Sequence, residues 1–214
     1  MPGERPSSHS ESEFIDEAYN LEDADSMAAF YRKWAADYDH QMLDLAGYTS
    51  PSRVAEILVE HLHDRSASIL DVGCGTGLTC RLLAQQNYVN LDGVDLSKDM
   101  LAVAGERGIY RHLLQADLNL PLPLAAEDYD GVISSGTFTH GHVGPEPLHE
   151  IFRILKPGGI LACTVHQDLW QSMGFETTFD ELAKQGLATE VSRSLESYYR
   201  DKPVEGWFCV YRKT

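Results

Sequence analysis

A buried strand that runs directly into a glycine-rich turn and then into a helix is the feature that most constrains this chain. The apolar segment SILDV at 68–72 is followed by a turn that contains Gly73, Gly75 and Gly77, and LTCRLLAQQ then continues with helical periodicity. A strand that feeds a helix through a tight turn returns to a parallel strand by a right-handed crossover. The chain therefore predicts an α/β fold built on a mostly parallel sheet.

The same alternation of strand and helix repeats along the middle of the chain. Helices are predicted in SKDMLAVAGERG and PLHEIFRIL, a turn in KPGG, and strands at 91–96, 110–118, 129–136 and 160–165. A parallel sheet made this way is covered by helices on both faces. After a helix at 175–186, strands at 188–199 and 207–213 lie close enough in sequence to pair as an antiparallel hairpin.

The N-terminal part of the chain has a different composition. Residues 1–25 are rich in Ser, Glu and Asp with Arg5 as the one basic residue, which predicts an acidic flexible tail. Amphipathic periodicity from Ser26 and again in SRVAEILVEHLHD predicts two helices, so that residues 26–64 form a helical lid. The tail at 1–25 therefore precedes one domain at 26–214.

Charge and cysteine content restrict the location and the partners. Acidic residues outnumber basic ones by 33 to 17, giving a net charge of −16, which argues against a nucleic-acid phosphate backbone as partner. No apolar run approaches the roughly 20 residues that span a bilayer, and MPGERPSSHSESE lacks the apolar segment of a signal peptide. We expect a cytoplasmic protein with reduced cysteines and no membrane partner; its oligomeric state is left open.

The glycine loop and the acids that follow it predict a ligand site. Small residues let the backbone approach a ligand, but the spacing G-x-G-x-G is tighter than the G-x-G-x-x-G of pyrophosphate-binding loops. Asp95 closes the next strand, twenty residues after Gly75, where a carboxylate can accept both hydroxyls of a ribose. Asp71 either braces the loop or contacts the cofactor's amino group. Asp117 can accept from an adenine amino group.

Five segments together resemble a known family. ILDVGCGTG, GVDLS, QADL, YDGVISSG and LKPGGIL, in this order and spacing, resemble the class I S-adenosylmethionine-dependent methyltransferases over about residues 27–214. FYRKWAADYD and GTFTHGHVGP are similar to the Williams–Beuren-region methyltransferase-like group. The resemblance implies a Rossmann-like seven-stranded sheet and S-adenosylmethionine as cofactor, with Gly73 and Gly75 at the cofactor, Asp95 at its ribose and Asp117 at its adenine.

The predicted cofactor site combines these positions with neighbouring side chains. Met100 and Leu118 are expected to pack on the adenine ring, and the resemblance places the tyrosines of the first helix over the bound cofactor. Cys74 lies in the loop and is interpreted as a packing residue without a base beside it. The complete set is Tyr31, Tyr38, Asp71, Gly73, Cys74, Gly75, Asp95, Leu96, Met100, Asp117, Leu118 and Ser134.

The acceptor is expected beside the loop at 137–143. Methyl transfer is an in-line displacement, so the protein must align the acceptor, exclude water and remove a proton from a hydroxyl acceptor. His140, His142 and His166 are the candidate general bases, although each could instead be an ordinary loop histidine. A small acceptor would be held against an apolar wall of Trp170, Met173 and Phe175.

Other functions remain as alternatives at this point. A zinc site from His140, His142 and His166 is conceivable, but no cysteine or acid completes a recognisable set, so we expect no metal. The leading hypothesis is methyl transfer to a small molecule. The rivals are a nicotinamide-dependent oxidoreductase, which should prefer G-x-G-x-x-G, and a non-catalytic cofactor-binding subunit.

Overall fold

The computed structural model describes residues 39, 42, 47–140 and 143–214. The predicted acidic tail and most of the first predicted lid helix lie outside these residues. The fold is therefore described from Gly47 onward, with Asp39 and Met42 added where they contact it.

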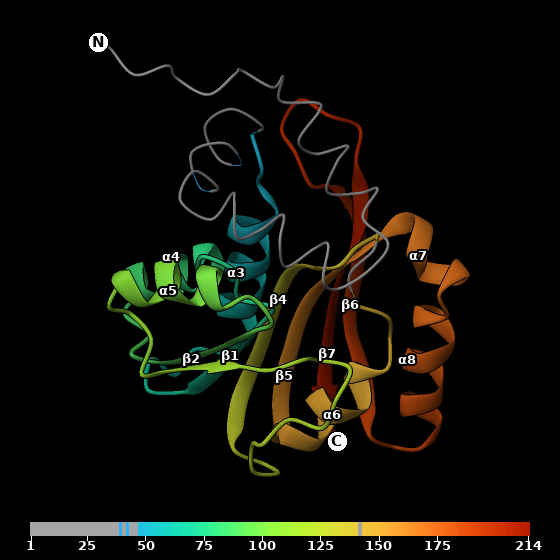
Figure 1. Cartoon of the computed structure of the whole chain (residues 1–214). Coiled ribbons are helices and arrows are strands. Elements are labelled where there is room, and N and C mark those ends of the chain that lie inside the picture. The colour runs from blue at the N-terminus through green and yellow to red at the C-terminus, as the bar shows by residue number, and fades with distance from the viewer. Residues whose placement is uncertain (1–38, 40–41, 43–46, 141–142) are drawn as a thin grey trace.

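One sheet of seven strands forms the centre of the described structure (Figure 1). Its order is β3-β2-β1-β4-β5-β7-β6; the strands β1 to β5 pair in parallel with one another, and β7 is antiparallel to both β5 and β6. This confirms the predicted Rossmann-like sheet and its C-terminal hairpin. The strands are β1 (Ser68–Val72), β2 (Asn90–Asp95), β3 (His112–Gln115), β4 (Tyr129–Phe138), β5 (Leu155–His166), β6 (Ala188–Ser197) and β7 (Glu205–Lys213).

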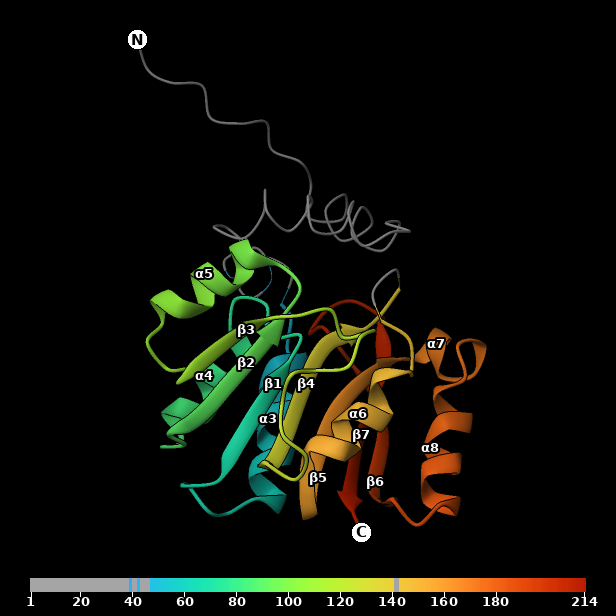
Figure 2. The same cartoon turned by 60° about the horizontal axis from the view of Figure 1, so that its bottom comes forward.

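Helices cover both faces of the sheet, as Figures 1 and 2 show. Buried side chains of α3 and α4 belong to one core cluster, and those of α6, α7 and α8 belong to a second cluster on the opposite face. The described helices are α3 (Ser50–His61), α4 (Leu78–Gln85), α5 (Lys98–Glu106), α6 (Pro147–Ile154), α7 (Gln167–Ser172) and α8 (Phe175–Lys184).

Alternate side chains of each central strand pack into the two core clusters on opposite faces of the sheet. In β5, Ala162 packs in the cluster of α3 and α4, whereas Leu161 and Cys163 pack in the cluster of α6 to α8. Successive side chains of a strand point to opposite faces, and burying a large aliphatic side chain contributes about 1.5–3 kcal/mol. The nearly continuous apolar runs predicted as central strands therefore stabilise two cores at once.

Three strands depart from the sequence prediction by more than a small shift of their ends. β3 ends at Gln115 rather than at 118, because Asp117 Oδ1 accepts the N–H of Asn119 (2.9 Å) and turns the chain. β5 begins at Leu155 and includes KPGG as an irregularity in its pairing with β4, where Gly158 has a φ of +80°. β6 does not alternate in burial, since it is the edge strand and is exposed along most of its length.

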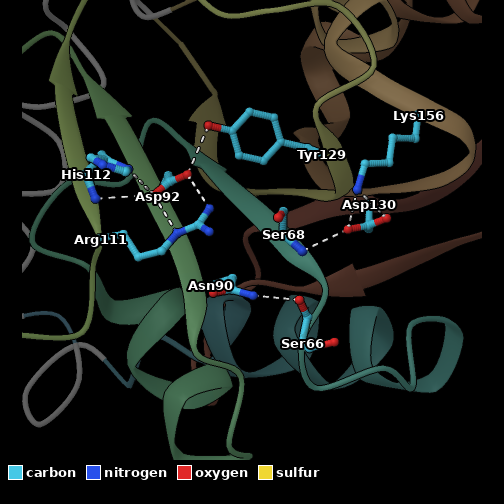
Figure 3. Close-up of polar contacts among 9 residues, drawn as sticks. All are labelled: Ser66, Ser68, Asn90, Asp92, Arg111, His112, Tyr129, Asp130 and Lys156. Atoms are coloured by element: carbon cyan, nitrogen blue, oxygen red, sulfur yellow. Dashed lines mark hydrogen bonds and ion pairs between the residues drawn. The ribbon is translucent and has the colours of Figure 1, made fainter.

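Polar side chains around the buried Asp92 join the strands near their amino ends (Figure 3). Asp92 on β2 accepts from Arg111 Nη2 (2.7 Å), from the Tyr129 hydroxyl (3.1 Å) and from the His112 N–H (3.2 Å). Burial by itself would raise the pKa of Asp92, but the hydrogen bonds from Arg111, Tyr129 and His112 outweigh it and lower the pKa. Asp92 thus links β2 to the starts of β3 and β4.

Replacing Asp92 should test this link. We expect Asp92→Asn to lower the free energy of unfolding at neutral pH by roughly 1–3 kcal/mol, because the charged partner of Arg111 is lost. The stabilisation from a lowered carboxyl pKa is present above the unfolded-state pKa and is lost as pH falls through the folded-state value. The gap between wild type and variant in urea unfolding should therefore narrow below about pH 4. Asp180→Asn, an exposed change on α8, is the control, and equal stability of wild type and Asp92→Asn at neutral pH would contradict the role.

Candidate functional site

The glycine loop between β1 and α4 is held in place by the end of β2. The N–H groups of Gly73 and Cys74 both donate to the carbonyl of Val94, at 2.9 and 3.0 Å. Gly73, Gly75 and Gly77 have φ of +67°, +53° and +86°, in the left-handed region that favours glycine. The sequence Gly-x-Gly-x-Gly is therefore required by the backbone path itself.

The three glycines differ in what surrounds them. A Cβ at Gly73 would lie 2.1 Å from Thr137 Oγ1, and one at Gly77 would lie 2.9 Å from the ring of Tyr110. At Gly75 a Cβ would meet nothing within 4 Å. Gly73 and Gly77 thus allow close packing, whereas Gly75 borders open space, as a loop that receives a ligand requires.

Asp95, at the end of β2, is oriented by two backbone groups. Its Oδ2 accepts the N–H of Gly75 and its Oδ1 accepts the N–H of Ser97, each at 2.8 Å. Burial raises the pKa of Asp95, and the backbone N–H groups of Ser97 and Gly75 partly offset this effect. The backbone N–H of Leu96 also contributes. Because a carboxylate has about four lone-pair sites, capacity remains to accept a hydroxyl group such as those of a ribose. The geometry fits the role predicted for this residue.

The predicted adenine contacts lie along the neighbouring strand ends. Asp117 follows β3 by two residues, and its Oδ1 accepts from both the N–H and the Nδ2 of Asn119, each at 2.9 Å. Met100 and Leu118 are buried, and Leu96 is exposed directly after β2. These residues stand at the carboxyl ends of β2 and β3, where open α/β sheets bind ligands.

Asp71 lies beneath the loop and is fully buried. Its Oδ2 accepts the hydroxyl of Tyr110 (2.9 Å), whose ring also occupies the space that a side chain at Gly77 or Gly93 would need. Burial raises the pKa of Asp71 to about 7, although the hydrogen bonds from Tyr110 and Cys80 lower it. Asp71 therefore contacts the Tyr110 side chain rather than the backbone of the glycine loop, and its predicted contact with the cofactor's amino group stays a prediction. Tyr110 was not predicted as a site residue. The sequence feature that could have indicated it is the pair Gly77 and Gly93, which have no side chains where the tyrosine ring lies.

Cys74 and Ser134 are also buried. Burial raises the pKa of the Cys74 thiol, and its Sγ would lie 3.0 Å from a Cβ at Gly93, so the side chain packs between the loop and β2. Ser134 Oγ donates to the carbonyl of Val72 (2.8 Å). Both side chains hold the loop against the sheet, and this placement agrees with the packing interpretation of Cys74.

Asp39 is a residue that the sequence analysis did not single out. Its Oδ1 accepts the hydroxyl of Thr76 (2.6 Å), and its Oδ2 is ion-paired with Arg107, which also donates to the carbonyl of Thr76. The N-terminal segment therefore reaches the glycine loop through Asp39. The segment FYRKWAADYD, which ends at Asp39, was predicted to contact the cofactor, but through Tyr31 and Tyr38 rather than through Asp39. Tyr31, Tyr38 and His142 all lie outside the described residues.

A polar cluster stands at the carboxyl ends of β4 and β5, on the other side of the glycine loop. Thr137 Oγ1 donates to the carbonyl of Val72 (3.0 Å), and three residues later His140 Nε2 lies 3.5 Å from Asp168 Oδ2. The same oxygen is 3.8 Å from His166 Nδ1, and the two imidazole rings are 4.7 Å apart. We call His140, His166 and Asp168 the histidine cluster.

His166 is the least exposed member of this cluster. It ends β5, and its Nδ1 accepts the N–H of Asp168 (3.3 Å) at the start of α7. Burial, and then the nearby His140, lower its pKa from the ordinary value, whereas Asp168 raises it. Of the predicted apolar wall of the acceptor site, Trp170 and Phe175 are buried in the core and Met173 is exposed, so their contact with an acceptor stays a prediction.

Comparison with known proteins identifies the family. A methyltransferase domain model matches residues 70–163. Solved structures with the same fold include an S-adenosylmethionine-dependent methyltransferase from Mesorhizobium loti (TM-score 0.57, 19% identity, 76% of this chain and 100% of that one) and the [4+2]-cyclase SpnF (TM-score 0.68, 19% identity, 90% and 97%). Because methyltransferase-like protein 27 from Homo sapiens is in addition 33% identical over 71% of its length, the chain belongs to the class I S-adenosylmethionine-dependent methyltransferases, and its cofactor is S-adenosylmethionine.

Two relatives are similar over most of the chain. Methyltransferase-like protein 27 from Homo sapiens is 33% identical over 176 residues, which cover 79% of this chain and 71% of that protein. Trans-aconitate 2-methyltransferase from Acidovorax sp. strain JS42 is 30% identical over 179 residues, covering 77% and 68%. Both likenesses extend well beyond the glycine loop. Among the described residues, no helix is long and apolar enough to cross a bilayer.

The contact of Asp39 with the loop predicts an effect on cofactor affinity. We expect Asp39→Asn to weaken binding of S-adenosylhomocysteine about 3- to 10-fold, because Thr76 and Arg107 lose a partly exposed partner worth about 1 kcal/mol. Isothermal titration calorimetry against wild type measures this change. Asp180→Asn on the distant α8 should bind as wild type does, and unchanged affinity in Asp39→Asn would show that the contact does not order the loop.

The raised pKa of Asp71 predicts a pH-dependent stability difference. A buried carboxyl with a raised folded-state pKa binds its proton more tightly in the folded chain, so its ionisation destabilises the fold as pH rises from about 4 to 7. Asp71→Asn removes that cost. We expect the free energy of unfolding of the variant, relative to wild type, to improve between pH 5 and pH 8 by roughly 1–4 kcal/mol. Parallel pH profiles in urea unfolding without cofactor would contradict this assignment.

Proposed function

We propose that this enzyme transfers the methyl group of S-adenosylmethionine to a small-molecule acceptor that binds beside the histidine cluster. The observation that carries the proposal is the connection between the two halves of the site. Gly73 of the cofactor loop approaches Thr137 of β4 so closely that a Cβ would not fit, and His140 follows Thr137 by three residues. The glycine loop and the histidine cluster are therefore parts of one edge of the sheet.

Different residues would bind different parts of the methyl donor. S-adenosylmethionine, when bound, supplies an electrophilic methyl group on its sulfonium. Asp95 would hold the ribose, Asp117 the adenine amino group, and Met100 and Leu118 the faces of the ring. Such binding fixes the donor, so that the remaining requirements are to align the acceptor and exclude water.

The acceptor side carries the groups that can activate a hydroxyl or amine. His140 is partly exposed, and His166 is buried beside it. Histidine ordinarily changes its charge near neutral pH, and its uncharged imidazole can accept a proton from an acceptor group. Together with His142 they remain our candidates for the general base. The net charge of −16 disfavours nucleic acid as the acceptor. The Acidovorax relative is named for a small carboxylic acid, which supports an acceptor of that size.

The assigned ribose contact is tested by titrating S-adenosylmethionine calorimetrically into wild type and variants. Asp95→Ala and Asp95→Asn should each lower affinity roughly 10- to 100-fold, because a hydrogen bond to a charged group contributes about 1.5–3 kcal/mol. Asp128→Ala, an exposed change at the opposite edge of the sheet, is the matched control. Urea unfolding of each variant separates lost binding from lost folding. Equal affinity of Asp95→Asn and wild type would overturn the contact.

The class of acceptor is tested with S-adenosylmethionine labelled in its methyl group. The enzyme is incubated with a cell extract that has been divided by filtration into low-mass and macromolecular fractions. We expect label in the low-mass fraction with wild type and, at a cofactor concentration near the wild-type Kd, much less label with Asp95→Ala. Label in protein or RNA alone would contradict a small acceptor.

Two rival functions give different results in the same assays. The likeness to SpnF shows that this fold can belong to a protein named a cyclase, so the fold alone does not establish transfer. A non-catalytic subunit would bind S-adenosylmethionine but label neither fraction. A nicotinamide-dependent oxidoreductase would bind NADH and not S-adenosylmethionine, which the tight G-x-G-x-G spacing disfavours.

A further inference from the structure

Three side chains with metal-binding atoms converge at the carboxyl ends of β4 and β5. His140 follows β4, His166 ends β5 and Asp168 lies in the first turn of α7. One ligand atom from each lies within 4.8 Å of the other two. Two separate strand ends and a helix start are therefore needed to bring the set together, and among the described residues no second group of this kind is present.

The distances are close to those of a bound divalent ion. His140 Nε2 and His166 Nδ1 lie 3.5 and 3.8 Å from the same oxygen, Asp168 Oδ2. Ligand atoms that share one tetrahedral zinc ion are about 3.3 Å from one another, given bonds of about 2.0–2.1 Å. Movements of less than about 1 Å would bring the three atoms to these positions.

The kind of ligands indicates the kind of metal. Two imidazoles and one carboxylate suit zinc, whereas magnesium and calcium prefer oxygen ligands. Three protein ligands also leave a fourth position for water or substrate, which is typical of catalytic rather than structural zinc. In the sequence alone, no cysteine or acid near the histidines completes a recognisable zinc set. In the structure Asp168 supplies the missing acid.

The state of His166 agrees with this use. Its Nδ1 accepts the backbone N–H of Asp168 at 3.3 Å, so this nitrogen carries its lone pair on the side where α7 begins. A metal on Nδ1 would take the place of that hydrogen bond, and the Asp168 carboxylate, whose side chain is 61% exposed, lies 3.8 Å from the same nitrogen.

We propose that His140, His166 and Asp168 form a binding site for a zinc ion beside the methyl acceptor. The role of that ion rests on the proposed function: its open position takes an oxygen of the acceptor, lowers the pKa of a hydroxyl there and fixes its direction. When the metal is bound, the proton of that hydroxyl passes to solvent water, and His140 and His166, which are base candidates in the metal-free enzyme, act as ligands of the metal.

Binding is tested without cofactor or acceptor. The full chain is freed of metal with a chelator and titrated with Co²⁺, whose visible absorption reports coordination by nitrogen, and Zn²⁺ is then added as competitor. We expect one equivalent of Co²⁺ per chain, displaced by Zn²⁺. His140→Gln, His166→Gln and Asp168→Asn should each weaken binding at least about 10-fold.

Matched variants make the result decisive. His149→Gln removes an exposed histidine of α6 and should bind Co²⁺ as wild type does. Thermal melts of the metal-free variants show whether each is folded, and the exposed Asp168→Asn keeps the test valid if His166→Gln does not fold. Absence of an absorption band in wild type, or equal affinity in Asp168→Asn and wild type, would overturn the site. Calorimetry with S-adenosylmethionine on the same samples tests the proposed function separately.

Discussion

The carboxylate of Asp95 is the interaction on which the ligand edge of this structure depends. By accepting the N–H groups of Gly75 and Ser97, it joins the glycine loop after β1 to the start of α5 after β2. Two separate crossover units are thereby fixed relative to each other at one charged group. The carboxylate is buried, which costs free energy, and the backbone donors offset part of that cost. The remaining lone pairs of the carboxylate can accept hydrogen bonds from the hydroxyl groups of a ligand.

The carbonyl of Val72 links the ends of β1 and β4 in the same way. It accepts hydroxyl groups from Ser134 and Thr137, at 2.8 and 3.0 Å, where the regular pairing of the strands has ended. Because Thr137 also fills the space beside Gly73, the end of β4 cannot move without moving the cofactor loop. Donor and acceptor halves of the proposed reaction are positioned by the same few atoms.

Much of this architecture could be read from sequence because it depends on local patterns. The alternation of apolar strands and helices predicted the parallel sheet, and the run GCGTG followed by Asp95 predicted the position of the ligand edge. What the sequence did not show depends on contacts between distant segments. Tyr110 was assigned to a strand, but its hydroxyl reaches Asp71 and its ring fills the space left by two glycines.

The same limit explains the other omissions. Asp39 contacts Thr76 and Arg107, which lie 37 and 68 residues away in the chain. His140 and Asp168 meet only because β4 and β5 pair in parallel and end at the same edge. No spacing rule within one segment marks such a set. The end of β3 and the start of β5 were predicted at residues 118 and 160 for a simpler reason. A turn made by the Asp117 side chain and an irregular strand pairing at KPGG leave little trace in a single sequence.

A crystal structure with S-adenosylhomocysteine bound would show whether Asp95 holds the ribose. We expect adenosine across the carboxyl ends of β1 and β2, with both ribose hydroxyls within hydrogen-bonding distance of Asp95 and the sulfur facing the histidine cluster. Adenosine bound elsewhere, or a ribose that makes no contact with Asp95, would contradict it.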